Sequence, residues 1–302
     1  MLVVDPDTNL PGRPPGPAAN AELLLDDSAT VADVERAQHG SADLARRGWA
    51  ATWPKLAAVA LALFLWQCVV WSGWRPEYAL PGPRVVFQQL GEMIADGTVF
   101  RALGTTMERA VYGFGLALAI GVLIGAVVTS SRIVRSAVGS LITGLQTMPS
   151  IAWFPLAIVL FKLSEGAITF VVVIGAAPSI ANGLISGVDH VPPVLRRAGR
   201  AMGAGRWATF RHVVLPAAVP SFVGGLKQGW SFAWRSLMAG ELLVTLGVFS
   251  VGFLLSQYRA ISDYPAMIAM MIVILAIGIL IDGVLFAALD RKVRQLYGLT
   301  ND

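Results

Sequence analysis

The residues of this sequence best suited to chemistry lie inside a long apolar stretch, residues 216–248. At intervals of three and four, it carries Lys227, Ser231, Trp234, Met238 and Glu241. A helix would align these side chains along one face about 21 Å long, with Arg235 beside Ser231. Charges inside a bilayer cost several kcal/mol unless they face protein or water, so this face is typical of a solute pathway. In the alternative, Lys227 and Glu241 extend to the two membrane interfaces and backbone carbonyls satisfy Arg235.

Two other apolar stretches contain polar residues next to a proline. Gln146 and Ser150 flank Pro149, and Asn182 follows Pro178. Helix breaks at membrane depth are tolerated where they line a cavity or pack on protein. These residues are therefore further candidates for a pathway, with simple packing as the alternative.

The sequence lacks the motifs of common enzymes. It contains no G-x-x-x-x-G-K-[ST] phosphate loop and no G-x-S-x-G motif, and its three histidines, His39, His190 and His212, are scattered. Its one cysteine, Cys68, excludes an intramolecular disulfide. We therefore expect no catalytic or metal site in this chain, and the energy for any transport must come from a partner or an ion gradient.

A polar segment, Pro192–Pro216, separates two apolar stretches and contains five arginines: Arg196, Arg197, Arg200, Arg206 and Arg211. Prolines fit the first turn of a helix, so the spacing predicts a short helix over Val194–Met202 that ends at Gly203. A second helical piece is expected from Trp207 to Val214, ending at Leu215-Pro216. A basic loop between membrane helices would explain the arginines, but not the spaced glycines and the Leu-Pro pair.

This segment resembles the cytoplasmic "EAA" loop of ABC-importer permeases, in which Glu-Ala-Ala is followed by Gly and later by Leu-Pro. The sequences V-P-P, A-M-G-A-G-R-W and V-V-L-P-A-A-V-P are similar to the nitrate/sulfonate/taurine/bicarbonate branch. Arg197 stands where the family has its glutamate, and Gly199 replaces the second alanine. The resemblance implies a coupling helix that contacts an ATPase, with the candidate residues Arg197, Ala198, Gly199, Arg200, Ala201, Gly203, Arg206, Leu215 and Pro216.

Composition indicates an integral membrane protein. Hydrophobic residues make up 55% of the 302 residues, charged residues make up 14%, and the mean hydropathy is +0.65. Soluble domains are nearer a quarter charged. Residues 1–50 differ from the rest, with Pro/Gly-rich sequence and eight Asp/Glu against four Lys/Arg. We expect a disordered cytoplasmic tail there, with a regulatory element as the alternative.

Residues 51–302 are expected to form the membrane domain, in which six stretches approach the roughly 20 residues that a spanning helix needs. The expected spans are residues 56–74, 110–130, 137–161, 167–186, 216–248 and 266–289, with a coupling loop at 187–215. Between the first two, A-L-P-G-P predicts a turn into an amphipathic surface helix. Lys and Arg are denser in alternate loops, which predicts that both termini and the coupling loop are cytoplasmic.

The resemblance covers residues 55–297 and implies an all-α, MetI-like permease in the cell membrane. It implies two copies of the chain, two cytoplasmic ABC ATPase subunits that bind ATP and Mg, and an extracytoplasmic solute-binding protein. The implied solute is a small anion of the sulfonate/taurine, nitrate or bicarbonate type. The chain is then not an enzyme, and its basic loops give no reason to expect nucleic acid. An ion-gradient transporter is the alternative, although residues 56–161 and 167–289 show none of the repeats typical of that class.

Overall fold

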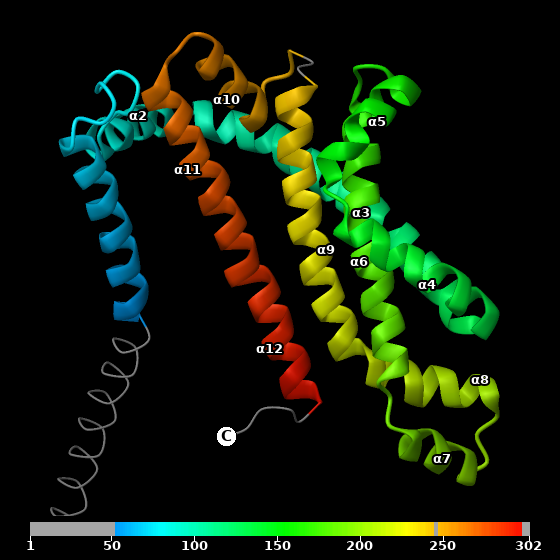
Figure 1. Ribbon diagram of the computed structural model, residues 1–302. Helices are drawn as coiled ribbons and strands as arrows, with labels where there is room; N and C mark the ends of the chain where they lie inside the picture. The colour runs from blue at the N-terminus through cyan, green and yellow to red at the C-terminus, as the bar shows by residue number, and fades with distance from the viewer. Residues whose placement is uncertain (1–51, 245–246, 298–302) are drawn as a thin grey trace, which may run out of the picture. The chain divides into compact units, whose positions relative to one another are not determined.

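The computed structural model describes residues 52–244 and 247–297, and every regular element within these ranges is a helix (Figure 1). The chain divides into two units, residues 1–72 and 73–302. The described part of the first unit is one apolar helix, Thr52–Trp71, which is long enough to cross a membrane. The expected tail, residues 1–50, lies outside the described residues.

The second unit begins with two helices joined by a tight turn. α2 (Pro83–Ala95) starts with proline in its first turn, as predicted from A-L-P-G-P. Gly97 adopts a φ of 78° and leads into α3 (Thr98–Ser130), which has 33 residues. The expected span 110–130 is therefore only the second part of a helix about 50 Å long.

A sharp bend interrupts the stretch expected as the third span. α4 (Arg132–Thr147) ends before Pro149, and the short helix η1 (Ser150–Trp153) continues into α5 (Phe154–Phe161). The two parts meet at 104°. Pro149 causes the break because it disfavours helical geometry in the residue before it, whereas Pro155 lies harmlessly in the first turn of α5.

The centre of the unit is the antiparallel pair α6 (Glu165–Asp189) and α9 (Leu215–Leu243), which lie side by side in Figure 1. Small residues allow this approach: a Cβ placed on Gly183 would lie 2.5 Å from the Cα of Gly225. α3 packs on α6 in the same way, because a Cβ on Gly121 would lie 2.8 Å from the Ala177 carbonyl oxygen. The predicted small-residue packing of G-V-L-I-G, residues 121–125, is thus present.

The segment between α6 and α9 contains the predicted short helix, α7 (Pro193–Ala201). After it, α8 (Arg206–Thr209), the π-helical turn η2 (Phe210–Val214) and α9 follow one another without a break. The prediction that the second piece ends at Leu215-Pro216 is therefore wrong. Pro216 lies in the first turn of α9, directly after the wide turn η2, where its missing N–H and fixed φ are tolerated.

The chain ends with α10 (Val251–Ala260) and a long helix built from α11 (Tyr264–Leu280), the π-helical turn η3 (Ile281–Phe286) and α12 (Ala287–Leu296). The long helix starts under the cap of Asp263, whose carboxylate accepts a hydrogen bond from the Ala266 N–H. It includes the expected sixth span.

By length and composition, four helices in the described ranges could cross a membrane, or five if the bent pair counts as one span. α9, expected as the fifth of six spans, is long enough at 29 residues but is not among them. Its glycines and its charged residues lower its hydropathy, and many of its side chains are buried against neighbouring helices. The division into six spans stays a prediction.

Candidate functional site

The polar face predicted on α9 divides into a buried part and an exposed part. Lys227 and Arg235 are exposed and Ser231 is half-buried, whereas Trp234 and Met238 are buried at 8% and 7% exposure. Glu241 is 1% exposed. The periodicity correctly aligned these residues, but neighbouring helices cover one edge of the face.

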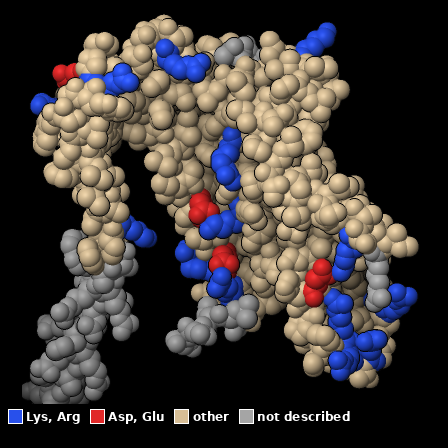
Figure 2. All heavy atoms as spheres, in the orientation of Figure 1, with Lys and Arg blue, Asp and Glu red and all other residues tan. Residues whose placement is uncertain are grey.

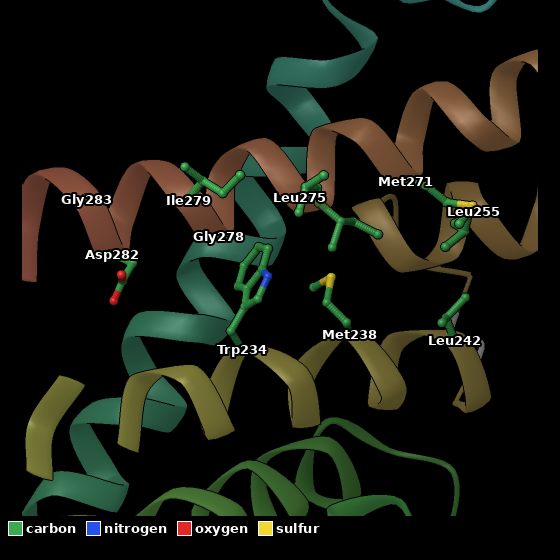
Figure 3. A pocket seen from close by; sticks show the side chains of 11 residues that line it. Trp234, Met238, Leu242, Leu255, Met271, Leu275, Gly278, Ile279, Asp282 and Gly283 are labelled. Atoms are coloured by element: carbon green, nitrogen blue, oxygen red, sulfur yellow. The ribbon is translucent and has the colours of Figure 1, made fainter. Parts of the chain in front are cut away.

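Trp234 and Met238 point toward α11 and line an apolar cavity of about 640 Å³ (Figure 3). Leu275 and Gly278 lie opposite them. A Cβ placed on Gly278 would lie 3.4 Å from Trp234 Nε1, so glycine leaves room for the indole. This cavity has almost no polar lining and is poorly suited to a hydrated anion.

The exposed charges of α9 form a row with those of the final helix (Figure 2). Lys227 Nζ lies 3.2 Å from Asp282 Oδ2 and forms a partly exposed ion pair with it. Arg235 lies over the Phe232 ring at 4.6 Å, and its Nε donates to the Ser231 carbonyl at 3.1 Å. Arg235 forms no ion pair within the described residues, which leaves its charge open to a solute.

Glu241 instead lies in a buried network between helices. Its carboxylate accepts hydrogen bonds from Arg109 Nη1 at 2.9 Å, from the Thr106 hydroxyl at 3.1 Å and from the Gly252 N–H at 2.9 Å. Arg109 also binds Glu165, the first residue of α6, through two nitrogens. The network joins α3, α6, α9 and α10, and removing one partner of its buried pair would cost roughly 3–5 kcal/mol because the other charge would be left uncompensated.

The Glu241 side chain is fully buried, so its carboxylate is satisfied by protein donors and does not extend into solvent. Thr106, Arg109 and Glu165 were not among the predicted site residues. Arg109 and Glu165 each stand at the edge of an apolar stretch, which marks them as interfacial but does not reveal that they meet.

The remaining pathway candidates all lie on or against one stretch of α6, with Ser150 beside Gly175, Gln146 against Ser179, and Asn182 in the helix itself. The Gln146 amide donates to the Ser179 hydroxyl at 3.2 Å and so ties α4 to α6. Ser150 begins η1, directly after the bend, and is half-buried. Asn182 is exposed on α6, next to the glycine that touches α9. Of the three, Asn182 is the most exposed.

α7 presents an exposed surface that mixes arginine with apolar side chains. Arg197, Ala198, Arg200 and Ala201 are exposed, as is Arg206 beyond the turn. Gly203, where the helix is predicted to end, adopts a φ of 82° and reverses the chain after α7. Apolar side chains stand out beside the arginines, with Val194 at 68%, Met202 at 79% and Trp207 at 72% exposure. Such a surface is typical of a protein contact.

Gly199 faces the other way and is buried against the chain's own next segment. A Cβ at this position would lie 3.3 Å from Val213 Cγ2, so glycine lets α7 lie close to η2. Gly199 therefore positions α7 and does not belong to its exposed surface. Leu215 is exposed at 41% and Pro216 is half-buried, both at the start of α9.

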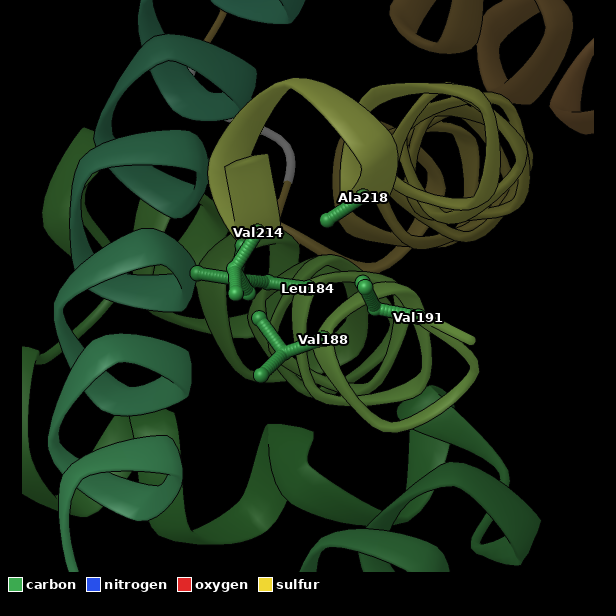
Figure 4. Close-up of a cluster of buried hydrophobic side chains, with 5 residues drawn as sticks. All are labelled: Leu184, Val188, Val191, Val214 and Ala218. Atoms are coloured by element: carbon green, nitrogen blue, oxygen red, sulfur yellow. The ribbon is translucent and has the colours of Figure 1, made fainter. Parts of the chain in front are cut away.

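Three contacts that the sequence did not reveal fix this loop to the helices. Arg196 donates to the Val188 carbonyl at the end of α6, and Arg135 of α4 pairs with Asp189. A buried apolar cluster, with Leu184, Val188 and Val191 from the α6 side and Val214 and Ala218 from the α9 side, closes the base of the loop (Figure 4). Lys and Arg gather at this end of the unit (Figure 2). No group of three or more His, Cys, Asp or Glu within the described ranges could hold a metal ion.

Comparison with known proteins identifies the class. The family model "Binding-protein-dependent transport system inner membrane component" matches residues 117–295, more than half of the chain. A putative ABC transporter permease of Methanocaldococcus jannaschii is 31% identical over 232 residues, which cover 76% of this chain and 86% of the relative. The chain belongs to this family and is a permease subunit of an ABC importer. It is not itself an enzyme, and the ATPase is a separate subunit.

Two further relatives have names that state a solute. The nitrate import permease of Synechocystis sp. and the bicarbonate transport system permease of Synechococcus elongatus are each 28% identical to this chain. The matches cover 74% and 75% of this chain, and 83% and 84% of the two relatives.

Solved structures agree on the fold. A chain of the MetNI methionine ABC transporter in an inward-facing conformation has a TM-score of 0.53 and 21% identity, covering 65% of this chain and 96% of its own. An amino acid ABC transporter structure has a TM-score of 0.54 and 16% identity, covering 67% and 97%. The expected all-α, MetI-like fold is confirmed.

Proposed function

We propose that this permease subunit forms the translocation pathway for a small anionic solute of the nitrate, bicarbonate or sulfonate/taurine type. The observation that carries the proposal is Arg235, an exposed cation on the central helix α9 with no carboxylate partner in the described residues. Lys227 lies two turns away on the same face, although Asp282 neutralises it in part. The names of the nitrate and bicarbonate permeases support the same solute class.

The working complex is proposed to contain two copies of this chain, two cytoplasmic ABC ATPase subunits and an extracytoplasmic solute-binding protein. α7 supports the ATPase contact, because a nine-residue helix with arginines and apolar side chains on its exposed surface is too short to be stable alone. ATP and Mg are bound by the ATPase. Two ATPases acting together imply a two-fold pair of permeases.

The complex is proposed to lie in the inner membrane, with both termini and α7 on the cytoplasmic side. The gathering of Lys and Arg around α7 and α8 supports this orientation, since cytoplasmic loops of membrane proteins carry an excess of these residues. By the same assignment, Glu165 and α10 lie near the outer surface.

Copurification and ATP hydrolysis test the proposal together. The full chain should bring down an ABC ATPase, and hydrolysis in proteoliposomes with the binding protein should rise with nitrate, bicarbonate or taurine and not with a neutral sugar. Purification without an ATPase, together with uptake that follows an ion gradient, would favour a secondary transporter. Stimulation by the sugar and by none of the anions would overturn the anion assignment.

Variants at Arg235 test the pathway itself. Arg235→Gln should lower solute-stimulated hydrolysis about tenfold or more while the ATPase still copurifies, because losing a charge that binds an anionic solute should cost at least about 1.4 kcal/mol, which is a factor of ten. Arg291→Gln, an exposed arginine on α12, is the matched control and should leave stimulation unchanged. Equal stimulation in both variants would remove Arg235 from the pathway.

A further inference from the structure

Side chains from two other helices satisfy backbone N–H groups at the amino end of α10. The first N–H groups of a helix have no partner within the helix and must be satisfied from outside. Here the Val251 N–H donates to the Thr106 hydroxyl at 3.0 Å, and the Gly252 N–H donates to the Glu241 carboxylate at 2.9 Å. The Ser250 hydroxyl supplies the local cap by accepting from the Phe253 N–H at 3.3 Å, and the side chains from α3 and α9 satisfy two further N–H groups and hold α10 against both helices.

The fit at this point depends on close contact. A Cβ placed on Gly252 would lie 2.3 Å from the Cβ of Glu241, which is closer than two such atoms can approach. Glycine is therefore required for α10 to reach the carboxylate. The contact is specific in shape as well as in charge.

Arg109 neutralises the buried carboxylate of Glu241. Its side chain is 12% exposed, and it joins Glu241, which is fully buried, to Glu165, which is 54% exposed. Glu165 and Glu241 stand at the same end of the α6–α9 pair, remote from α7. One guanidinium therefore holds both helices of the central pair to α3 at that end.

The surroundings of the Glu241 carboxylate favour a positioning role over a role in the solute pathway. All the groups around its carboxylate are protein donors: a guanidinium, a hydroxyl and an amide. The open pocket beside Arg109, about 320 Å³, is lined by Glu108 and Glu165, and Glu241 does not line it. A carboxylate sealed from that pocket and surrounded by donors cannot meet a solute in this conformation.

We propose that Arg109 and Glu241 form a buried clamp that fixes the remote end of the α6–α9 pair and the amino end of α10 to α3, and that coupling of hydrolysis to solute requires this clamp. The proposal rests on the proposed function for its link to hydrolysis, but not for the clamp itself. In it, Glu241 is a positioning residue and does not contact solute.

Three variants test the clamp: Arg109→Gln, Glu241→Gln and the double variant. Each single variant leaves a strained or unpaired buried group, so solute-stimulated hydrolysis should fall roughly tenfold or more while the ATPase still copurifies. The double variant leaves no buried charge and should recover a substantial part of the stimulation. If Glu241 touched solute, the double variant would be as inactive as the worse single variant, and that result would overturn the proposal. Glu108→Gln, an exposed neighbour on α3, is the control.

A second measurement follows α10 without reference to transport. In a Cys68→Ser background, a cysteine at Leu254, which is 3% exposed, should resist an impermeant thiol reagent in detergent-solubilised full-length protein. Each single variant should raise the labelling rate at least several-fold, and the double variant should raise it less. Gly252→Ala should raise it as well, because the added methyl group displaces α10 without changing a charge.

The two measurements separate the possible failures. If no ATPase copurifies with the parent, the proposed function fails, and the labelling still decides whether the clamp exists. If labelling at Leu254→Cys is the same in the parent and all variants, the clamp is wrong even when the importer assignment holds.

Discussion

At the scale of single residues, the turn between α2 and α3 depends on one exposed carboxylate. Asp96 Oδ1 accepts a hydrogen bond from the Thr98 N–H at 2.8 Å, in the first turn of α3. This backbone hydrogen bond, with help from the Thr98 hydroxyl and the charge of Arg101, holds the pKa of Asp96 below its ordinary value. A carboxylate near a helix amino terminus is favoured in its charged form.

A lowered pKa in the folded state makes this contribution depend on pH. The stabilisation is fully present above the ordinary pKa of aspartate and is lost as the pH falls through the lower folded value. Exchange of the Thr98 amide hydrogen should therefore speed up in acid relative to neighbouring amides. Asp96→Asn should remove that acid dependence and leave a cap of similar quality near neutral pH. The same acid response in Asp96→Asn would rule out this carboxylate as its source.

Gly203 gives a second prediction at this scale. Its φ of 82° strains a β-branched residue, and no atom lies within 4 Å of a Cβ placed there, so the cost is in the backbone alone. Gly203→Val should cost roughly 1–3 kcal/mol of local strain and misplace α7. The chain should still insert in the membrane while ATPase copurification weakens. Gly205→Ala is the control, since Gly205 has a φ of −65° that any residue adopts.

At the scale of the elements, Arg135 and Asp189 link α4 to the end of α6 directly before α7. Both side chains are more than a third exposed, so the pair contributes little stability on its own. We expect the pair to make α4 move together with the end of α6 when that end is displaced. Arg135→Asp and Asp189→Arg should each reduce solute-stimulated hydrolysis several-fold, and the combined exchange should restore it, because the pair forms again with its charges reversed. Failure of the combined variant to recover would show that the pair does not link the two helices.

The elements themselves could be predicted to different degrees. Proline and glycine mark helix ends through their own backbone geometry, so α2, α7 and the turn at Gly203 follow from local sequence. The helix end predicted at Leu215-Pro216 is wrong, because the π-helical turn before it allows a proline within a continuous helix. The meeting of Arg109, Glu165 and Glu241 could not be predicted, because it joins residues more than fifty positions apart and a single sequence holds no record of such contacts.

For the whole molecule, the expected orientation can be tested with introduced cysteines. Glu92 and Ser262 are exposed near α2 and α10 and should react with an impermeant thiol reagent from outside intact cells. On the cytoplasmic side Met202, which is 79% exposed, is a better reporter than the buried Thr209. A cysteine at Met202 should react only after the cells are opened. Reaction at Met202 in intact cells would reverse the assigned orientation.

The glycine contacts between α6 and α9 have a mechanical consequence. Where Gly183 meets Gly225 and Gly187 meets Ala218, almost no side chain lies between the two backbones, so few rotamers can change to absorb a displacement. The loop that carries α7 leaves one helix of this pair and returns into the other. A displacement of α7 should therefore move α6 and α9 together as one rigid body. Its far end, about 37 Å away along α6, is the point that Arg109 holds.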